Sequence, residues 1–467
     1  MLLRSLIRRT GIRHVTSTSS RLESLRAELA AEDDDVYHSH RFGHESYYAK
    51  LRRPVLEATT MNPEAYRSRG FYESEQKLLF AKAWQVVGYT EKLRQPGDTI
   101  VATAAGQPIL VTRGKDNQIR GFYNVCRHRG AQLVANHGRF PVISCPYHRW
   151  GYALDGRLVA TPMFKGDGVS DSVLPPEESE PSEAVKQAFS TECVKNFNKK
   201  DYGLLPVRIE TSGPFVYANV SGDAPPLQSY LGDLNQSLHE YPFDELVSYK
   251  QATLTVNCNW KLLAENFMEY YHLPAVHPEL CNVSGVDDHH RAQGTGSYIG
   301  FVTSPLTNGG TPLDLDVLPP MPGLTGANKV TAWFHHYFPN AFYFLLPHGL
   351  FAVILDPTGP TTTVEHAELF VHPNVFEDPD HKEKLDKMWA FYDQTNQEDF
   401  NICERVQVGV KAQAYQGGRM TFRFEETIHR FQNLVADYMT GRPNYSPRGD
   451  ALPPYAFERA FKETPHN

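Results

Sequence analysis

The sequence predicts an α+β fold in which a small β domain precedes a larger domain that combines a sheet with helices. Three observations support this prediction. From Gln95-Pro96-Gly97-Asp98 onward, the chain breaks into short β-like runs separated by turn residues. Longer apolar strands are predicted at 330–356 and 363–372. Two segments near the C-terminal end, 379–410 and 421–439, have helical periodicity.

The segment before the β domain is predicted to be helical. Asn62-Pro63-Glu64 is typical of a helix start, and an amphipathic helix is expected over 74–87. Its apolar positions are Leu78, Leu79, Ala81, Trp84 and Val87. The β-like runs that follow include 109–112, 121–125 and 141–145.

Regular structure is expected again after an acidic, Pro- and Ser-rich insertion near 166–184. Strands are predicted near 205–220 and 246–257, and a helix over 258–272. Residues 279–328 are rich in Gly, Pro, Asn and Asp, which is typical of a long loop that covers a site. The predicted segments are 1–30 (an N-terminal segment of distinct composition), 31–81 (helical), 82–208 (β domain) and 209–467 (larger α+β domain).

Composition excludes several classes of protein. Six cysteines in 467 residues are too few for a disulfide scaffold. The formal net charge of −8 argues against a nucleic-acid binder, which usually has a basic face. No apolar run of about 18 residues occurs, so no membrane span is predicted.

The first twenty residues differ from the rest of the chain. They contain four arginines and several Ser and Thr, and the first acidic residue is Glu23. This composition is typical of an organellar transit segment. We expect the mitochondrial matrix, with the chloroplast stroma or the cytoplasm as alternatives; a basic tail without targeting function is the other interpretation.

Two cysteine–histidine pairs form the first candidate site. Cys126-x-His128 is followed after sixteen residues by Cys145-x-x-His148. Two Cys and two His can bind one zinc ion, but common zinc fingers pair Cys with Cys and His with His. A mixed pair in each loop instead suits two irons bridged by sulfides.

With the flanking Arg129-Gly130 and Trp150-Gly151, residues 85–165 resemble the Rieske domain of ring-hydroxylating oxygenases. The resemblance implies a Rieske [2Fe–2S] cluster in a Rieske-type β domain. It also implies that the two cysteines bind one iron and the two histidines bind the other. Such a cluster relays single electrons and does not react with substrate.

A second candidate site lies in 259–277. Glu265, Glu269 and His272 are spaced i, i+4 and i+7, which predicts a shared helix face. Pro274 disfavours helix at the preceding residue, so His277 is expected on the departing turn or loop. Alone, two histidines near a helix end are more often structural than metal-binding.

With a Rieske motif upstream, this segment resembles the mononuclear iron motif of the oxygenase α subunits. The resemblance implies a helix-grip-like α+β catalytic domain with an antiparallel sheet, and a mononuclear Fe(II) bound by His272 and His277. The third ligand should be a distant Asp. Asp399 is our choice, and Glu398 and Asp393 are its rivals.

The same resemblance assigns roles to two further residues. Asn266 is expected beside the iron, and Glu269 is expected to connect a Rieske histidine of one subunit to an iron-binding histidine of the next. This arrangement implies a homotrimer. Most ring-hydroxylating members carry Asp at the position of Glu269, while Glu is typical of the quaternary-amine branch, which includes choline and carnitine monooxygenases.

The predicted function is therefore a Rieske-type oxygenase that uses O₂ and hydroxylates a small quaternary amine, with choline to betaine aldehyde preferred. Since no G-x-G-x-x-G follows a strand, electrons are expected from a separate ferredoxin or NAD(P)H-dependent reductase. An aromatic ring-hydroxylating dioxygenase is the alternative, and a pure Rieske electron-transfer protein is a third hypothesis.

Two other segments have competing interpretations. Asp287-Asp288-His289-His290 imitates a metal site but is interpreted as a solvated loop. The aromatic residues within 333–344 could hold a permanent cation, although packing on a sheet is the commoner role of such rings.

Overall fold

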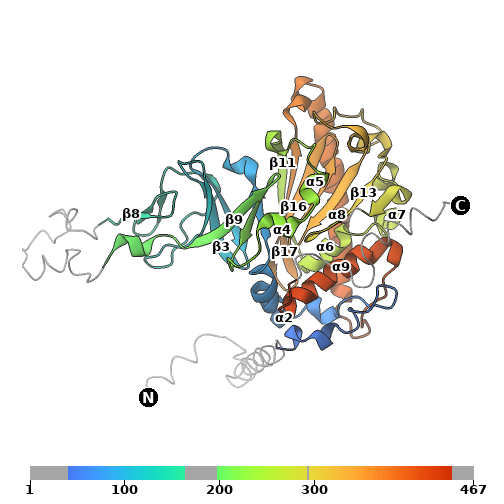
Figure 1. Cartoon of the computed structure of the whole chain (residues 1–467). Helices are drawn as coiled ribbons and strands as arrows, with labels where there is room; N and C mark the ends of the chain where they lie inside the picture. The colour runs from blue at the N-terminus through green and yellow to red at the C-terminus, as the bar shows by residue number, and fades with distance from the viewer. Residues whose placement is uncertain (1–39, 163–196, 292–293, 444–467) are drawn as a thin grey trace, which may run out of the picture.

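The computed structural model describes residues 40–162, 197–291 and 294–443 of the chain. The predicted targeting segment 1–30 and the acidic insertion near 166–184 lie outside the described residues. Figure 1 shows a β domain on one side of the molecule and a larger domain of sheet and helices on the other. The predicted α+β fold with antiparallel sheets is confirmed.

The β domain contains a seven-stranded antiparallel sheet with the order β1-β10-β9-β4-β3-β2-β5. Its strands are β1 (Gln85–Tyr89), β2 (Asp98–Ala104), β3 (Gln107–Arg113), β4 (Ile119–Tyr123), β5 (Gly138–Arg139), β9 (Pro206–Ser212) and β10 (Phe215–Asn219). A smaller sheet holds β6 (Ile143–Ser144), β7 (Gly151–Tyr152) and β8 (Leu158–Ala160). The β-like runs predicted in this part of the sequence therefore lie in or beside strands.

The expected boundary after residue 208 falls inside β9. This strand pairs with β4, and β10 then pairs with β1 at the start of the domain. Both strands hydrogen-bond to the first sheet, so the β domain extends to Asn219. Composition along the chain does not reveal a pairing between strands more than 100 residues apart.

The larger domain is built on a second seven-stranded antiparallel sheet with the order β11-β17-β16-β15-β14-β13-β12. Its strands are β11 (Val247–Val256), β12 (His289–Arg291), β13 (Tyr298–Thr303), β14 (Ala332–Tyr337), β15 (Ala341–Leu346), β16 (Gly349–Gly359) and β17 (Thr362–Val371). The predicted strands at 330–356 and 363–372 are confirmed. The predicted long loop, 279–328, includes two short strands, β12 and β13.

Six of the described helices lie after the β domain in sequence: α4 (Leu227–Leu231), α5 (Leu234–Ser237), α6 (Trp260–Phe267), α7 (Leu273–Val276), α8 (His381–Gly409) and α9 (Phe422–Met439). The two helices predicted over 379–410 and 421–439 are confirmed as α8 and α9. Asn259 and Thr421 cap α6 and α9, because their side chains accept hydrogen bonds from the first-turn amides of Lys261 and Phe424.

Alternate residues of the second sheet face two different cores. On β15 and β16, Phe342, Phe351 and Val353 pack with residues of α6, α8 and α9. Their neighbours Tyr343 and Ala352 pack with β1, β10 and α4. Successive side chains of a strand point to opposite faces, so one sheet joins the helices to the β domain.

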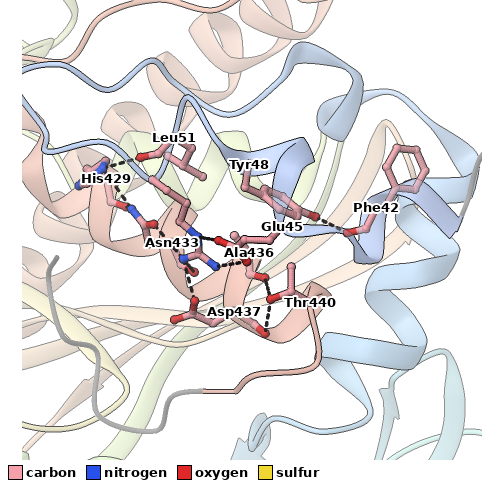
Figure 2. A network of polar contacts seen from close by, with 10 residues as sticks. Phe42, Glu45, Tyr48, Leu51, His429, Asn433, Ala436, Asp437 and Thr440 are labelled. Carbon is pink, nitrogen blue, oxygen red and sulfur yellow. Dashed lines mark hydrogen bonds and ion pairs between the residues drawn. The ribbon is translucent and has the colours of Figure 1, made fainter.

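The described residues before the β domain belong to the core of the larger domain. Phe42, Tyr48 and Phe71 are buried with residues of α6 and α9. Figure 2 shows the polar contacts that attach this segment to α9. The His429 side chain bonds the carbonyl of Leu51 at 2.8 Å. Arg52 contacts Glu45 at 2.6 Å, Asn433 at 2.9 Å and Asp437 at 2.7 Å.

The amphipathic helix expected over 74–87 is shorter and earlier than predicted. Helix α2 (Arg69–Glu75) begins after Ser68, whose Oγ accepts from the amide of Phe71, and continues as one π-helical turn, Gln76–Phe80. Trp84 and Val87 are buried beside and within β1. Their apolar character, read as a helix face, reflects a strand that is buried on both sides.

A buried ion pair joins α2 to α6. Lys261 Nζ donates to Glu75 Oε1 at 2.7 Å, Trp260 Nε1 donates to Glu75 Oε2 at 3.3 Å, and the Lys261 and Glu75 side chains are both 0% exposed. Burial raises the pKa of Glu75 and lowers the pKa of Lys261, while their mutual attraction opposes both shifts. The pair therefore fixes the helix from which the second candidate site begins.

We expect Lys261→Met to destabilise the protein strongly, because it leaves the Glu75 carboxylate buried without its cation. Breaking a buried pair typically costs about 3–5 kcal/mol, whereas replacing both partners by apolar residues is often neutral. Thermal unfolding followed by circular dichroism measures the effect. The double variant Glu75→Leu/Lys261→Met should recover much of the loss.

Lys382→Met is the matched control, since Lys382 is 73% exposed in its contact with Asp386. It should leave the unfolding midpoint nearly unchanged. Equal midpoints for Lys261→Met and the wild type would contradict the role given to the buried pair.

Candidate metal centres and cavity

The first pair of cysteine and histidine lies on the loop between β4 and β5, and the second between β6 and β7. In the first loop, the amide of Cys126 donates to Ala131 at 2.8 Å and the amide of Gly130 donates back to Cys126 at 3.0 Å. This tight turn needs a positive φ of 73° at Gly130. In the second loop, the amide of Cys145 donates to the carbonyl of Trp150 at 2.8 Å.

The two loops bring their four side chains together at one end of the β domain. Cys126 and Cys145 are buried in the core of this domain, at 3% and 1% exposure. His128 and His148 are half-buried, with ring centroids 4.7 Å apart. The His128 ring also stacks on Trp150 at 4.7 Å. The thiols thus lie inside and the imidazoles lie nearer the surface.

This arrangement fits a two-iron cluster better than a single zinc ion. In the described part of the chain, only His272, His277 and Asp399 place three possible ligand atoms within 4.8 Å of one another. The two Cys and two His are therefore spread more widely than a tetrahedral zinc site with ligand distances of about 2.0–2.3 Å requires. A centre with two irons spans such a separation, with cysteines at one iron and histidines at the other.

The second candidate site forms where α8 passes the end of α6. Asp399 Oδ1 lies 2.8 Å from His277 Nε2 and 3.5 Å from His272 Nε2. Three donors of the 2-His-1-carboxylate type thus converge on one point, which leaves the opposite side open. The donor set fits a mononuclear iron.

The shared helix face predicted for Glu265, Glu269 and His272 is wrong. Helix α6 ends at Phe267. Glu265 is directed elsewhere and accepts hydrogen bonds from Tyr66 at 2.8 Å and Gln432 at 3.0 Å. Glu269 accepts from the amides of Tyr271 and His272, and this local bonding competes with continued helix.

His277 lies outside helix, as expected, but the preceding Leu273 is helical although Pro274 was expected to disfavour helix there. A short helix, α7, begins directly after His272, and His277 follows its last residue. Pro274 lies in the first turn of α7, where its missing N–H leaves no helical hydrogen bond unmade. Both histidines therefore flank one short helix.

Each of the two histidines also has a carboxylate at Nδ1, the ring nitrogen that faces away from the metal position. Glu269 Oε1 lies 2.5 Å from His272 Nδ1, and Glu398 Oε2 lies 2.7 Å from His277 Nδ1. Such contacts fix the proton at Nδ1 and direct the Nε2 lone pair toward a metal. Glu398, considered as a rival ligand, lies behind His277, and Asp393 lies outside the cluster of ligand atoms.

The electrostatics of this cluster favour a cation. Burial alone lowers the pKa of His272, but Asp399 and Glu269 outweigh this effect and raise it to about 9. Burial raises the pKa of Asp399, but the two histidines outweigh it and lower the pKa. The side chains therefore take up positive charge as protons, which a bound metal replaces.

A cavity of about 80 Å³ extends from Asp399 and Asn266. The Nδ2 atom of Asn266 lies 3.5 Å from His272 Nε2, so this residue lies beside the candidate metal site, as predicted. Most of the remaining wall is apolar and aromatic. Its rings are Phe267, Phe334, Phe342, Phe344, Phe351 and Tyr392.

The aromatic segment 333–344 divides between two environments. Phe334, Phe342 and Phe344 line the cavity, while Tyr337 and Tyr343 are packed in the core next to the β domain. The segment 287–290 also divides. Asp287 is fully exposed, as a solvated loop predicts, but His289 is buried at 4% exposure and stacks on Tyr270.

The sequence analysis missed Glu365, a residue of β17 that lines the cavity and is 1% exposed. Asn396 Nδ2 donates to its Oε1 at 2.5 Å. Burial, together with the charges of Asp399 and Asp393, raises the pKa of Glu365 to about 8. The available signal was weak, because Glu365 is one of two acids in β17 and the sequence does not show which of them faces the cavity.

Comparison with known proteins matches both domains. Residues 83–174 match the Rieske [2Fe-2S] domain, and residues 243–441 match the catalytic domain of the ring-hydroxylating alpha subunit. The chain belongs to the Rieske non-haem iron oxygenases. Its domains imply a Rieske [2Fe–2S] cluster and a mononuclear iron, and the two donor sets described above fit these groups.

Three curated relatives act on quaternary amines according to their names. The glycine betaine monooxygenase oxygenase subunit of Pseudomonas aeruginosa is 26% identical over 406 residues, which cover 80% of this chain and 87% of the relative. The carnitine monooxygenase oxygenase subunit of Acinetobacter baumannii is 28% identical, covering 80% and 93%. The chloroplastic choline monooxygenase of Spinacia oleracea is 24% identical, covering 81% and 78%.

Solved structures share the fold of this oxygenase. A quaternary ammonium Rieske monooxygenase described for carnitine oxidation superposes with a TM-score of 0.68 at 24% identity, covering 83% of this chain and 97% of the other. Naphthalene 1,2-dioxygenase with bound indole superposes with a TM-score of 0.63 at 19% identity, covering 89% and 98%. None of the described helices has the length and apolarity that a membrane span requires.

We expect Glu398→Ala to weaken iron binding at the mononuclear site, because His277 loses the acceptor that orients its ring. Loss of such an outer partner typically costs about 10–100-fold in metal affinity. Competition for Fe(II) with a chelator measures the affinity, while visible absorption monitors the [2Fe–2S] cluster, which should be unchanged. Glu383→Ala is the matched control on the same helix, since its side chain is 78% exposed. Equal affinity for Fe(II) in the two variants would contradict the role of Glu398.

Proposed function

We propose that this oxygenase hydroxylates a small quaternary amine, with choline as the preferred substrate. The observation that carries the proposal is the aromatic cavity that begins at Asp399 and Asn266. Aromatic faces attract permanent cations, and a quaternary ammonium has no N–H group with which to form a hydrogen bond. The names of the relatives agree with this substrate class.

In the proposed reaction, one oxygen atom of O₂ enters a C–H bond of the alcohol carbon of choline. The other leaves as water, with two electrons and two protons from outside the chain. The resulting geminal diol loses water to give betaine aldehyde. The electrons come from a separate ferredoxin or NAD(P)H-dependent reductase.

We assign the metal-binding residues as follows. Cys126 and Cys145 hold one iron of the cluster, and His128 and His148 hold the other. His272, His277 and Asp399 hold the mononuclear iron. When bound, the cluster supplies single electrons and the mononuclear iron supplies the site of O₂ activation.

The chain's own residues prepare this site. Glu269 and Glu398 keep the protons of His272 and His277 at Nδ1, so both Nε2 atoms face the metal position. The apolar wall excludes water from the side where substrate binds. Asn266 offers an amide to a hydroxyl group beside the metal.

Electron transfer between subunits is part of the proposal. In Figure 1, the small sheet containing β8 and the helix α7 lie at opposite sides of the molecule, which favours transfer to a neighbouring chain over transfer within one chain. We propose a homotrimer in which Glu269 connects a neighbour's Rieske histidine to His272. Oxygenase subunits of this family receive electrons from a reductase or ferredoxin and form multimers.

The alternative functions have less support. Naphthalene 1,2-dioxygenase has the same fold, but the buried acid Glu365 in the cavity wall favours a polar or cationic substrate over a multi-ring hydrocarbon. A pure electron carrier needs no second donor set, whereas His272, His277 and Asp399 converge on one point.

The wild-type holoenzyme, supplied with a suitable reductase, should couple oxygen uptake to the oxidation of choline. Carnitine, glycine betaine and simple aromatics are the comparison substrates, and mass spectrometry identifies the products. If the enzyme oxidises none of the quaternary amines tested, the proposed function is refuted.

Iron analysis separates an oxygenase from an electron carrier. The wild type should hold about three irons per chain, two in the cluster and one at the mononuclear site. His272→Ala should lose one iron and all hydroxylation but keep the cluster absorption. A variant that still forms product would contradict the assignment of this ligand.

Localisation remains a prediction, since residues 1–30 lie outside the described residues. We expect a fusion of residues 1–30 to a fluorescent protein to enter mitochondria, because this segment is rich in arginine and contains no acid before Glu23. Fluorescence microscopy tests this. Import into plastids, as the name of the spinach relative suggests for that protein, or cytoplasmic fluorescence would refute it.

A further inference from the structure

Glu365 is a buried acid in the apolar cavity with half of its carboxylate unsatisfied. Its Oε1 accepts the hydrogen bond from Asn396, but its buried Oε2 has no partner among the described residues. A buried polar atom without a partner is costly unless the site gains one in another state. The feature therefore points to a ligand.

The fold directs Glu365 to the cavity side of the sheet. On β17 it pairs with Leu355 of β16, which is buried in the core that includes α6 and α8. Glu368, three residues later, faces the opposite side and pairs with Lys92 at 2.6 Å. Glu368 thus has a lysine as its ion-pair partner, whereas Glu365 faces the cavity and has none there.

The surroundings of Glu365 contain negative charge and no cationic side chain. Among the described residues that line the cavity, none is Lys, Arg or His. Asp399 is the other acid in the wall, and Asp393 on α8 lies near enough to affect Glu365. The cavity wall therefore supplies no cationic side chain to Glu365, and a cationic ligand would favour the ionised form of this carboxyl, whose pKa burial and the neighbouring acids raise.

The aromatic wall completes a site for such a charge. Phe334, Phe344 and Phe351 are cross-strand neighbours on β14, β15 and β16, with ring centroids 5.9 Å and 4.8 Å apart. Tyr392 of α8 packs edge-on against Phe344 at 4.9 Å, and its buried hydroxyl has no partner among the described residues. Rings supply faces to the cation, and the hydroxyl supplies a donor to a neutral oxygen.

We propose that Glu365 is the counter-ion of the substrate's ammonium group and selects substrates whose remaining part is uncharged. The inference rests on the proposed function and extends it to substrate choice. A substrate with a carboxylate, such as glycine betaine or carnitine, would bring another negative charge into a wall that contains Glu365 and no cationic side chain. An alcohol such as choline finds Tyr392 and Asn266 as hydrogen-bonding groups.

The test compares choline with its neutral carbon analogue, 3,3-dimethylbutan-1-ol, which has the same shape without the charge. Isothermal titration of the holoenzyme measures Kd for both, and oxygen uptake gives KM and kcat. We expect the wild type to bind choline at least about 30-fold more tightly than the analogue. Glu365→Gln should reduce this ratio to about threefold or less, mainly through a higher KM for choline, and should weaken discrimination against glycine betaine.

Two further variants separate charge from structure. Glu365→Asp keeps the negative charge and should keep most of the preference for choline. Asp393→Asn removes one charge from the neighbourhood without changing the cavity wall and should keep the wild-type ratio. Iron content and cluster absorption verify that each variant is loaded.

The outcomes distinguish this inference from the proposed function. Oxidation of choline by a wild type that binds both compounds equally would overturn the inference and leave the proposed function intact. An unchanged ratio in Glu365→Gln would also overturn it. Failure of the wild type to oxidise any quaternary amine would overturn the proposed function itself.

Discussion

The second candidate site depends on one contact between distant parts of the chain, because Asp399 has to meet His272 and His277 across more than 120 residues of sequence. A carboxylate and two imidazoles form a metal site only if their supporting elements are fixed to within fractions of an ångström. Helix α8 brings Asp399, and the segment after α6 that contains α7 brings the histidines. Much of the catalytic domain serves to hold these two helices against one sheet.

The sheet also separates two tasks. One face supplies the aromatic wall of the cavity, and the other packs against β1, β10 and the helices α4 and α5. Asn340 ties the two domains directly, since its side chain exchanges two hydrogen bonds with the backbone of Val86 at 3.0 and 2.9 Å. The β domain is therefore positioned by the same strands that shape the cavity.

The sequence predicted what is local in the chain. Strand and helix order followed from periodicity, and the Cys126–His128 and Cys145–His148 pairs were recognisable because each lies within one loop. Asp399 came only from family resemblance, since an acid on a long helix is otherwise a solvated residue. The end of α6 was misplaced because helical spacing cannot anticipate that the Glu269 side chain captures the next amides. Glu365 was missed because its partners, Asn396 and the aromatic rings, meet it only in the folded sheet.

The placement of residues 40–83 in the core of the catalytic domain makes that domain discontinuous in sequence. The chain starts this core, leaves it to build the β domain, and returns from β10 to complete it with α9. During synthesis, the early segment waits for partners more than 350 residues away, such as Asn433 for Arg52. Contacts of such sequence separation form slowly, so the cluster-binding domain can fold before the catalytic core closes around its first segment.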